Sequence, residues 1–98
     1  MIGTTEKEFY EQLYYGSDIE MKDNKWYYMI YSAYLETGEH SIRVWKYDSL
    51  GNDAKISEEL YNHVSQLPEQ SIELFKKSKI FNGKSFLEIE KNMEILSM

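Results

Sequence analysis

Apolar residues recur with two different spacings near the start of the chain. Phe9 and Leu13 stand four residues apart, so a helix would place both on one face, and we expect a helix over residues 5–15. Ile19 and Met21 instead alternate with charged residues, and this two-residue period is typical of a strand with one buried face. The pattern therefore predicts a helix followed by a strand.

The middle of the chain carries the strongest strand pattern. The segment KWYYMIYSAYL, residues 25–35, is rich in aromatic side chains and contains neither glycine nor proline. The segment HSIRVWKYD, residues 40–48, has a similar composition. Asp-Asn at 23–24 and Thr-Gly at 37–38 can form the connecting turns, since Asn, Asp and Gly tolerate the positive φ that tight turns need. We expect a three-stranded antiparallel meander that also includes residues 18–22.

The sequence after the meander predicts helices. Ser57 can cap a helix whose apolar residues, Leu60, Val64 and Leu67, recur at helical spacing. Pro68 suits the first turn of a further helix, PEQSIELFKK, because the proline nitrogen has no hydrogen to leave unpaired there.

The C-terminal tail, KIFNGKSFLEIEKNMEIL, predicts a turn, a short helix and a last strand. Asn82 and Gly83 suit the turn, Ser85 and Glu88 fit a capping box, and residues 93–95 alternate in polarity. The whole chain is therefore expected to form one α+β domain, with an N-terminal helix, a three-stranded antiparallel meander and C-terminal helices packed on the sheet.

The central hairpin is predicted to carry apolar side chains on both faces. A two-residue turn would place Ala33 opposite Ile42 and Ile30 opposite Trp45. One predicted face carries Trp26, Tyr28, Ile30, Tyr34, Arg43, Trp45 and Tyr47. The other carries Tyr27, Met29, Tyr31, Ala33, Leu35, Ile42 and Val44. A half-exposed antiparallel sheet normally has one polar face, so either helices cover both faces or one face binds another protein.

The face that carries both tryptophans is expected to be the core, because Ile19 and Met21 fall on it. The residues of the expected open, partner-binding face are Tyr27, Met29, Tyr31, Ile42 and Val44. Tyrosine contributes strongly to protein interfaces because it offers a large, rigid contact area with a polar group. A change of one residue in the turn register would exchange these assignments.

The charge of the chain points to a second kind of contact. The net charge is −6, and an acidic chain repels phosphate backbones, so no direct binding to nucleic acid is expected. The acidic residues of a second expected contact surface are Glu6, Glu8, Glu11, Glu20 and Asp23. Their carboxylates could imitate nucleic-acid phosphates in a basic cleft of a partner. The alternative is that they only solvate an amphipathic helix.

The residue types that catalysis or metal binding needs are sparse. The chain has no cysteine, no serine in a nucleophile motif, and two histidines without ligand-like spacing. Residues 48–53 hold several oxygen ligands, but no glutamate follows at the distance a calcium loop requires, so a polar turn is expected. We expect no enzyme activity, cofactor or metal. No apolar run approaches a membrane span and no secretory signal pattern is present, so we expect a cytoplasmic protein.

The window SKIFNGKS, residues 78–85, comes close to the phosphate-binding pattern G-x-x-x-x-G-K-[ST]. Ser78 stands where that pattern has its first glycine, and a helix rather than a long strand is expected before it. No later apolar strand ends in an acidic residue placed for magnesium. We therefore interpret the window as a turn before a capped helix, with nucleotide or small-molecule binding as an alternative.

The tail from Lys79 to Leu96 resembles that of uncharacterised small acidic proteins from Gram-positive bacteria and their prophages. These share an apolar residue, a turn, GKS, an apolar residue and x-E-[IL] before a last short strand. The resemblance implies no site residues. The acidity, the small size, the aromatic sheet surface and the absence of catalytic groups lead us to expect a non-enzymatic protein-binding module of the immunity or phage anti-defence type. Such a module would occlude a surface of a nucleic-acid-binding, defence or toxin protein. The alternative is a structural domain that forms a homodimer through its aromatic sheet face.

Overall fold

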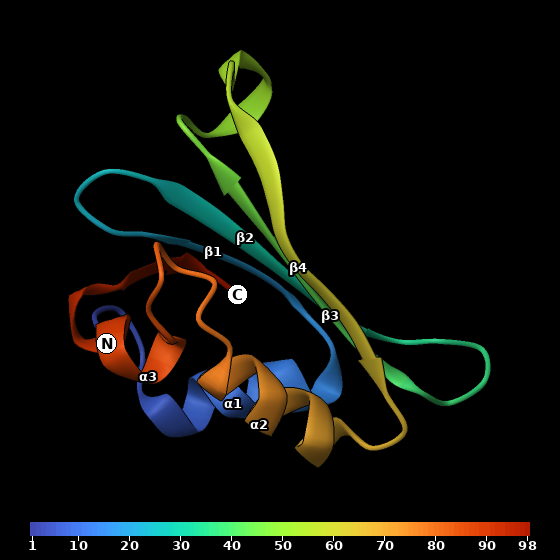
Figure 1. Ribbon diagram of the computed structural model, residues 1–98. Coiled ribbons are helices and arrows are strands. Elements are labelled where there is room, and N and C mark those ends of the chain that lie inside the picture. Colours follow the sequence, from blue (N-terminus) through green and yellow to red (C-terminus); the bar gives the residue numbers. More distant parts are fainter.

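The computed structural model describes residues 1–98 as a layer of helices packed against one side of a five-stranded antiparallel sheet (Figure 1). The strands lie side by side in the order β4-β3-β2-β1-β5. The strands are β1 (Asp18–Lys22), β2 (Tyr27–Tyr34), β3 (His40–Tyr47), β4 (Ser57–Ser65) and β5 (Glu94–Ser97). The helices are α1 (Glu6–Tyr15), α2 (Pro68–Lys77) and α3 (Phe86–Ile89), with short 3-10 turns at Gly51–Asp53 and Glu90–Asn92. None of the helices has the length and apolar composition needed to cross a membrane.

The helices begin at the caps that the sequence predicts. At the start of α1, the side-chain oxygen of Thr5 accepts a hydrogen bond from the backbone nitrogen of Glu8 at 3.2 Å. Pro68 occupies the first turn of α2. Ser85 and Glu88 form the capping box of α3, in which each side chain bonds to the backbone of the other residue. The predicted helices at these three places are confirmed.

The predicted sheet of three strands is an undercount, because β4 and β5 flank the meander. The helix predicted from Ser57 is wrong, since this segment pairs with β3 along its whole length. A bulge shifts the β3–β4 register between Val44 and Trp45, and it leaves Leu60 and Tyr61, which are consecutive, both half-buried. This interrupts the alternation that marks a strand.

β5 confirms the short last strand, and it completes the sheet beside β1. The N-terminal residues cover its outer edge: the nitrogen of Ile2 donates to the carbonyl of Met93 at 2.9 Å, and the nitrogen of Ile95 donates to the carbonyl of Ile2 at 2.7 Å. A Cβ atom at Gly3 would lie only 2.5 Å from the Ile95 oxygen. A glycine is therefore needed where the chain leaves this edge.

The turn between β2 and β3 differs from the expected two-residue turn. The nitrogen of Leu35 donates to the carbonyl of Glu39 at 2.8 Å, and the nitrogen of Gly38 donates back to the carbonyl of Leu35 at 2.9 Å. Three residues therefore lie between the last paired positions, with Gly38 at a φ of 88°, as in a three-residue hairpin loop. The register shifts by one, so Ile30 lies opposite Val44.

This shift turns every β3 side chain to the face opposite to the one predicted. Tyr28, Ile30 and Ser32 of β2 share the helix-covered face with Ile42 and Val44 of β3. The fully or nearly fully buried core is Phe9, Leu13, Ile19, Met21, Tyr28, Ile30, Ile42, Val44, Ile72, Phe75, Phe81, Phe86, Met93 and Ile95. α1 packs on β2 and α2 packs on β3 and β4, so the core lies between one face of the sheet and the helices.

Candidate functional site

The side of the sheet turned away from the helices carries a band of large side chains. We call this band the open face; its residues are Tyr27, Met29 and Tyr31 of β2 and Arg43, Trp45 and Tyr47 of β3. Five of these residues are half-buried, and Arg43 is exposed. Figure 1 shows no helix on this side of the sheet. The chain alone therefore leaves these side chains in contact with solvent and with one another.

The open face is ordered by contacts across neighbouring strands. Arg43 forms an ion pair with Glu59 of β4, with 2.6 Å between Nη2 and Oε2. The Arg43 guanidinium also lies 5.8 Å from the centre of the Trp45 ring, within reach of a cation–π contact. Trp45 and Tyr47 stack with ring centres 6.5 Å apart. A contiguous surface of aromatic rings and one fixed cation results.

Contacts at this surface move the pKa values of Tyr31 and Glu59 away from neutrality. Burial, followed by a hydrogen bond with Tyr47, raises the pKa of Tyr31 to about 12. The hydrogen bond from Arg43 lowers the pKa of Glu59 below its usual value. The open face thus offers hydroxyl groups, aromatic rings and a closed ion pair, which are groups suited to contact with another macromolecule.

The residues predicted for the open face divide into two sets. Tyr27, Met29 and Tyr31 lie on it. Ile42 and Val44 do not: both are 0% exposed in the core, because the longer turn shifts the β3 register by one residue. Sequence reasoning placed Arg43, Trp45 and Tyr47 in the core, and their side chains lie on the open face instead.

The predicted acidic surface is not assembled in one place. Glu6, Glu8 and Glu11 lie on α1 within the helix layer. Glu20 lies on β1 beside Met29, so it borders the open face on the other side of the sheet. Of these four residues, only Glu20 therefore lies next to the open face. The fifth acidic residue lies in the turn between β1 and β2.

That residue, Asp23, is engaged within the chain. Its Oδ1 atom accepts hydrogen bonds from the backbone nitrogens of Lys25 and Trp26, both at 2.8 Å. Its Oδ2 atom accepts a hydrogen bond from the Tyr28 hydroxyl at 3.1 Å. Burial and the Asp23 charge raise the pKa of Tyr28, so the hydroxyl remains a donor. Asp23 therefore fixes the β1–β2 turn.

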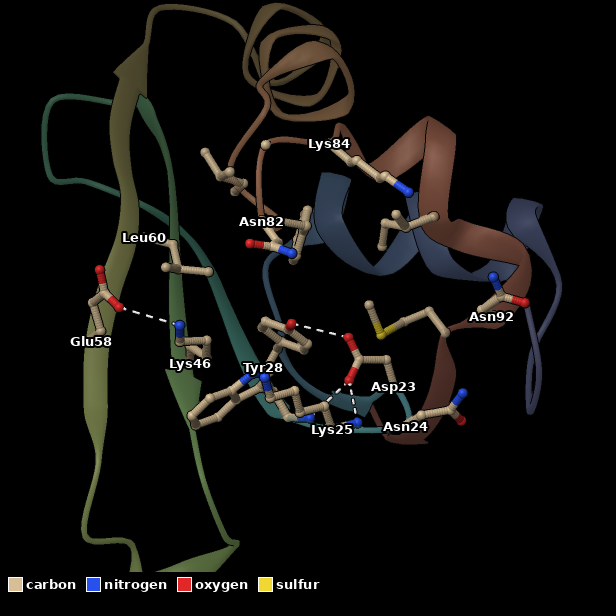
Figure 2. Close-up of a pocket in the computed structure, with 16 residues that line it drawn as sticks. Asp23, Asn24, Lys25, Tyr28, Lys46, Glu58, Leu60, Asn82, Lys84 and Asn92 are labelled. Carbon is tan, nitrogen blue, oxygen red and sulfur yellow. Dashed lines mark hydrogen bonds and ion pairs between the residues drawn. The ribbon is translucent and has the colours of Figure 1, made fainter.

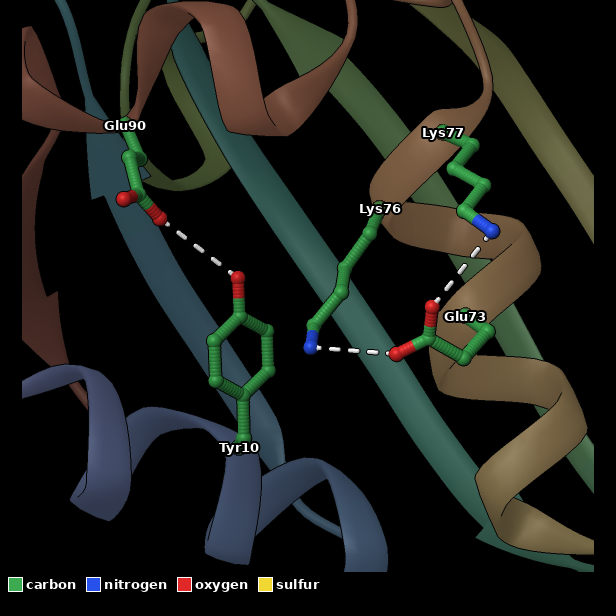
Figure 3. A network of polar contacts seen from close by, with 5 residues as sticks. All are labelled: Tyr10, Glu73, Lys76, Lys77 and Glu90. Atoms are coloured by element: carbon green, nitrogen blue, oxygen red, sulfur yellow. Dashed lines mark hydrogen bonds and ion pairs between the residues drawn. The ribbon is translucent and has the colours of Figure 1, made fainter.

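A polar network lies at the outer surface of the helix layer (Figure 3). The Lys76 ammonium lies 4.3 Å from the centre of the Tyr10 ring and 3.3 Å from a carboxylate oxygen of Glu73. The Tyr10 hydroxyl donates to Glu90 at 3.5 Å. Burial, and then a contact with Glu6, raise the pKa of Glu90. The network ties α1 to α2 and to the C-terminal segment.

The loop between β3 and β4 is closed by a carboxylate, as expected for a polar turn. Asp48 Oδ1 accepts hydrogen bonds from the backbone nitrogens of Lys55 at 2.9 Å and Ile56 at 3.2 Å. These bonds, that of Ile56 first, lower the pKa of Asp48. No three His, Asp or Glu side chains lie close enough together to hold a metal ion.

Neither protein-family models, nor curated proteins, nor solved structures gave a match to this chain.

Proposed function

We propose that the chain is a small, non-enzymatic protein-binding module that uses the open face to cover a surface of another protein. The observation that supports this most directly is the position of Tyr31 and Trp45 on the uncovered side of a sheet whose other side is filled by helices. Contiguous aromatic patches that face solvent, here with half-buried side chains, often mark interaction sites in proteins.

The charge around the open face favours a partner with basic residues around an apolar centre. Lys22 pairs with Glu94 at 3.6 Å, and Arg43 pairs with Glu59. Asp18 and Glu20 of β1 have no ion-pair partner within the chain, and the net charge is −6. Complementary charges around an apolar centre raise the rate of association and set its orientation.

Affinity capture with matched variants tests the proposal. The variant Tyr27/Tyr31→Ala removes two tyrosines from the open face. The control variant Tyr14/Tyr15→Ala removes two exposed tyrosines from α1. Thermal unfolding first establishes that both variants fold. We expect the wild type and the control to retain the same host protein and the open-face variant to lose it. Equal retention by the two variants, or no specific protein with the wild type, would contradict the proposal.

The open face could instead be used by a second copy of the chain. Light scattering separates the two cases. We expect a monomer at micromolar concentration. A dimer that dissociates in the Tyr27/Tyr31→Ala variant would contradict the proposal that the open face covers a different protein.

Immunity to a toxin and inhibition of a phage-defence protein are the roles we propose for such a module. A toxin gene beside the coding gene would favour the first role, and a cluster of phage accessory genes the second.

A further inference from the structure

A cavity of about 640 Å³ opens on the helix side of the sheet, away from the open face (Figure 2). Its walls come from the turn after β1, from the β3–β4 pair, and from the turn at residues 80–84. Ligand sites in proteins commonly enclose roughly 300–1,000 Å³. The cavity therefore has room for a small organic molecule, and it lies where the near phosphate-binding window of the sequence forms its turn.

The turn itself is a tight reversal rather than a phosphate loop. Asn82 has a φ of 54° and Gly83 a φ of 79°, and Phe81 and Lys84 exchange backbone hydrogen bonds of 3.0 and 3.1 Å. These geometries confirm the interpretation of the window as a turn. Because the chain reverses at this turn, Asn82 and Lys84 line the cavity from one side.

The uncompensated charge of the cavity is positive. Of the two acidic residues that line it, Asp23 accepts hydrogen bonds from two backbone nitrogens of its turn and from the Tyr28 hydroxyl, and Glu58 pairs with Lys46 at 3.3 Å. Lys25 and Lys84 also line the cavity and form no ion pair. Three lysines and two acidic residues line the cavity, so its lining carries one excess positive charge. In a protein of net charge −6, this is a local reversal that favours an anion.

The apolar wall of the cavity includes a half-buried indole ring. The Lys46 ammonium lies 4.6 Å from the centre of the Trp26 ring, and the Lys25 ammonium lies 5.8 Å from it. Leu60, Ile80 and Ile89, which are half-buried, add further apolar surface. A flat ring can pack against these apolar side chains beside the two ammonium groups, and the amide of Asn82, which also lines the cavity, can donate a hydrogen bond.

We propose that this cavity binds a small organic anion that consists of a planar ring and one phosphate or carboxylate group. The ring lies against the apolar wall that includes Trp26, and the anionic group pairs with Lys84. Figure 2 shows Lys84 on the opposite side of the cavity from Lys25 and Lys46. The site is independent of the open face, so its occupancy and the proposed protein contact can be tested separately.

Tryptophan fluorescence in a Trp45→Phe background reports on Trp26 alone, because the chain has two tryptophans. The probes are adenosine monophosphate and nicotinate, which distinguish a phosphate from a carboxylate and do not emit in the tryptophan band, with adenosine and inorganic phosphate as half-ligands. We expect at least one of the two anions to give a saturable change and both half-ligands to bind at least about tenfold more weakly. Lys84→Ala should weaken binding of that anion about tenfold, and Lys7→Ala, an exposed lysine of α1, should leave it unchanged.

Three results would overturn the proposal. The first is that neither anion gives a saturable signal at millimolar concentration. The second is equal binding by Lys84→Ala and Lys7→Ala, which would place the ligand elsewhere. The third is that inorganic phosphate or adenosine binds as tightly as the better of the two anions. The ligand would then not need a ring and a charge in one molecule.

Discussion

The Nε2 atom of His40 lies 2.8 Å from the carbonyl oxygen of Leu13, and this contact joins β3 to the last turns of α1. A carbonyl oxygen only accepts hydrogen bonds, so Nε2 carries the hydrogen. The Ser71 hydroxyl of α2 donates to the His40 carbonyl at 3.0 Å. His40 is 0% exposed. One buried residue therefore links the sheet to both long helices.

Replacing His40 should show how much this link stabilises the fold. His40→Phe keeps a ring but leaves the Leu13 carbonyl without its donor, so we expect the free energy of unfolding to fall by about 1–3 kcal/mol. His40→Gln retains an N–H donor and should lose less. Urea denaturation of both variants measures the difference. A Phe variant as stable as the wild type would show that the hydrogen bond contributes nothing.

Two neighbouring residues of β2 test which face of the sheet the helices cover. Ile30 is 0% exposed in the core, so Ile30→Ala should lower the free energy of unfolding by about 2–5 kcal/mol. Met29 is half-buried on the open face, so Met29→Ala should cost at most about 1 kcal/mol. Chemical denaturation under identical conditions compares them. A larger loss for Met29→Ala would place the core on the other side.

Glu90 should make the stability depend on pH in an unusual direction. Its folded-state pKa is raised, so ionised Glu90 opposes folding once the pH exceeds the ordinary glutamate pKa, and the stability present below that pH is lost as the pH rises. Glu90→Gln should therefore raise the free energy of unfolding at neutral pH, by up to about 1 kcal/mol. The gain should vanish near about pH 3.5, where the wild-type carboxyl is protonated.

Urea denaturation at the two pH values measures this effect. Glu11→Gln is the matched control, because Glu11 is an exposed carboxylate on α1; it should leave the stability at neutral pH nearly unchanged. If Glu90→Gln were less stable than the wild type at neutral pH, the contact between Glu90 and the Tyr10 hydroxyl would outweigh the effects of burial and of Glu6.

The sequence predicted correctly which face of the sheet the β2 side chains lie on, and it predicted the wrong face for the β3 side chains. The reason is local. The alternation of Tyr27, Met29 and Tyr31 with buried residues depends on β2 alone. The orientation of Trp45 depends on the number of residues in the turn, and Thr-Gly is compatible with a loop of two or three residues. One residue of loop length therefore decided which side chains form the open face.

The other errors come from interactions between segments that are distant in sequence. Leu60, Val64 and Leu67 do recur at helical spacing, but pairing with β3 and the bulge at Val44 override that local pattern. The cavity on the helix side of the sheet likewise joins residues 23–26 to the turn at residues 80–84. The sequence contained the Asn-Gly turn and Lys84, but it held no signal that Trp26 lies on the same cavity.

Hydroxyl-radical footprinting of the captured complex tests the role of the open face most directly. In the protein alone, Met29, Tyr31 and Trp45 should be oxidised at measurable rates. In the complex we predict that these rates fall severalfold, while Tyr15 and Leu87, which are 74% and 50% exposed outside the open face, react as before. Protection of Tyr15 and Leu87 with unchanged oxidation of Trp45 would contradict the proposed contact.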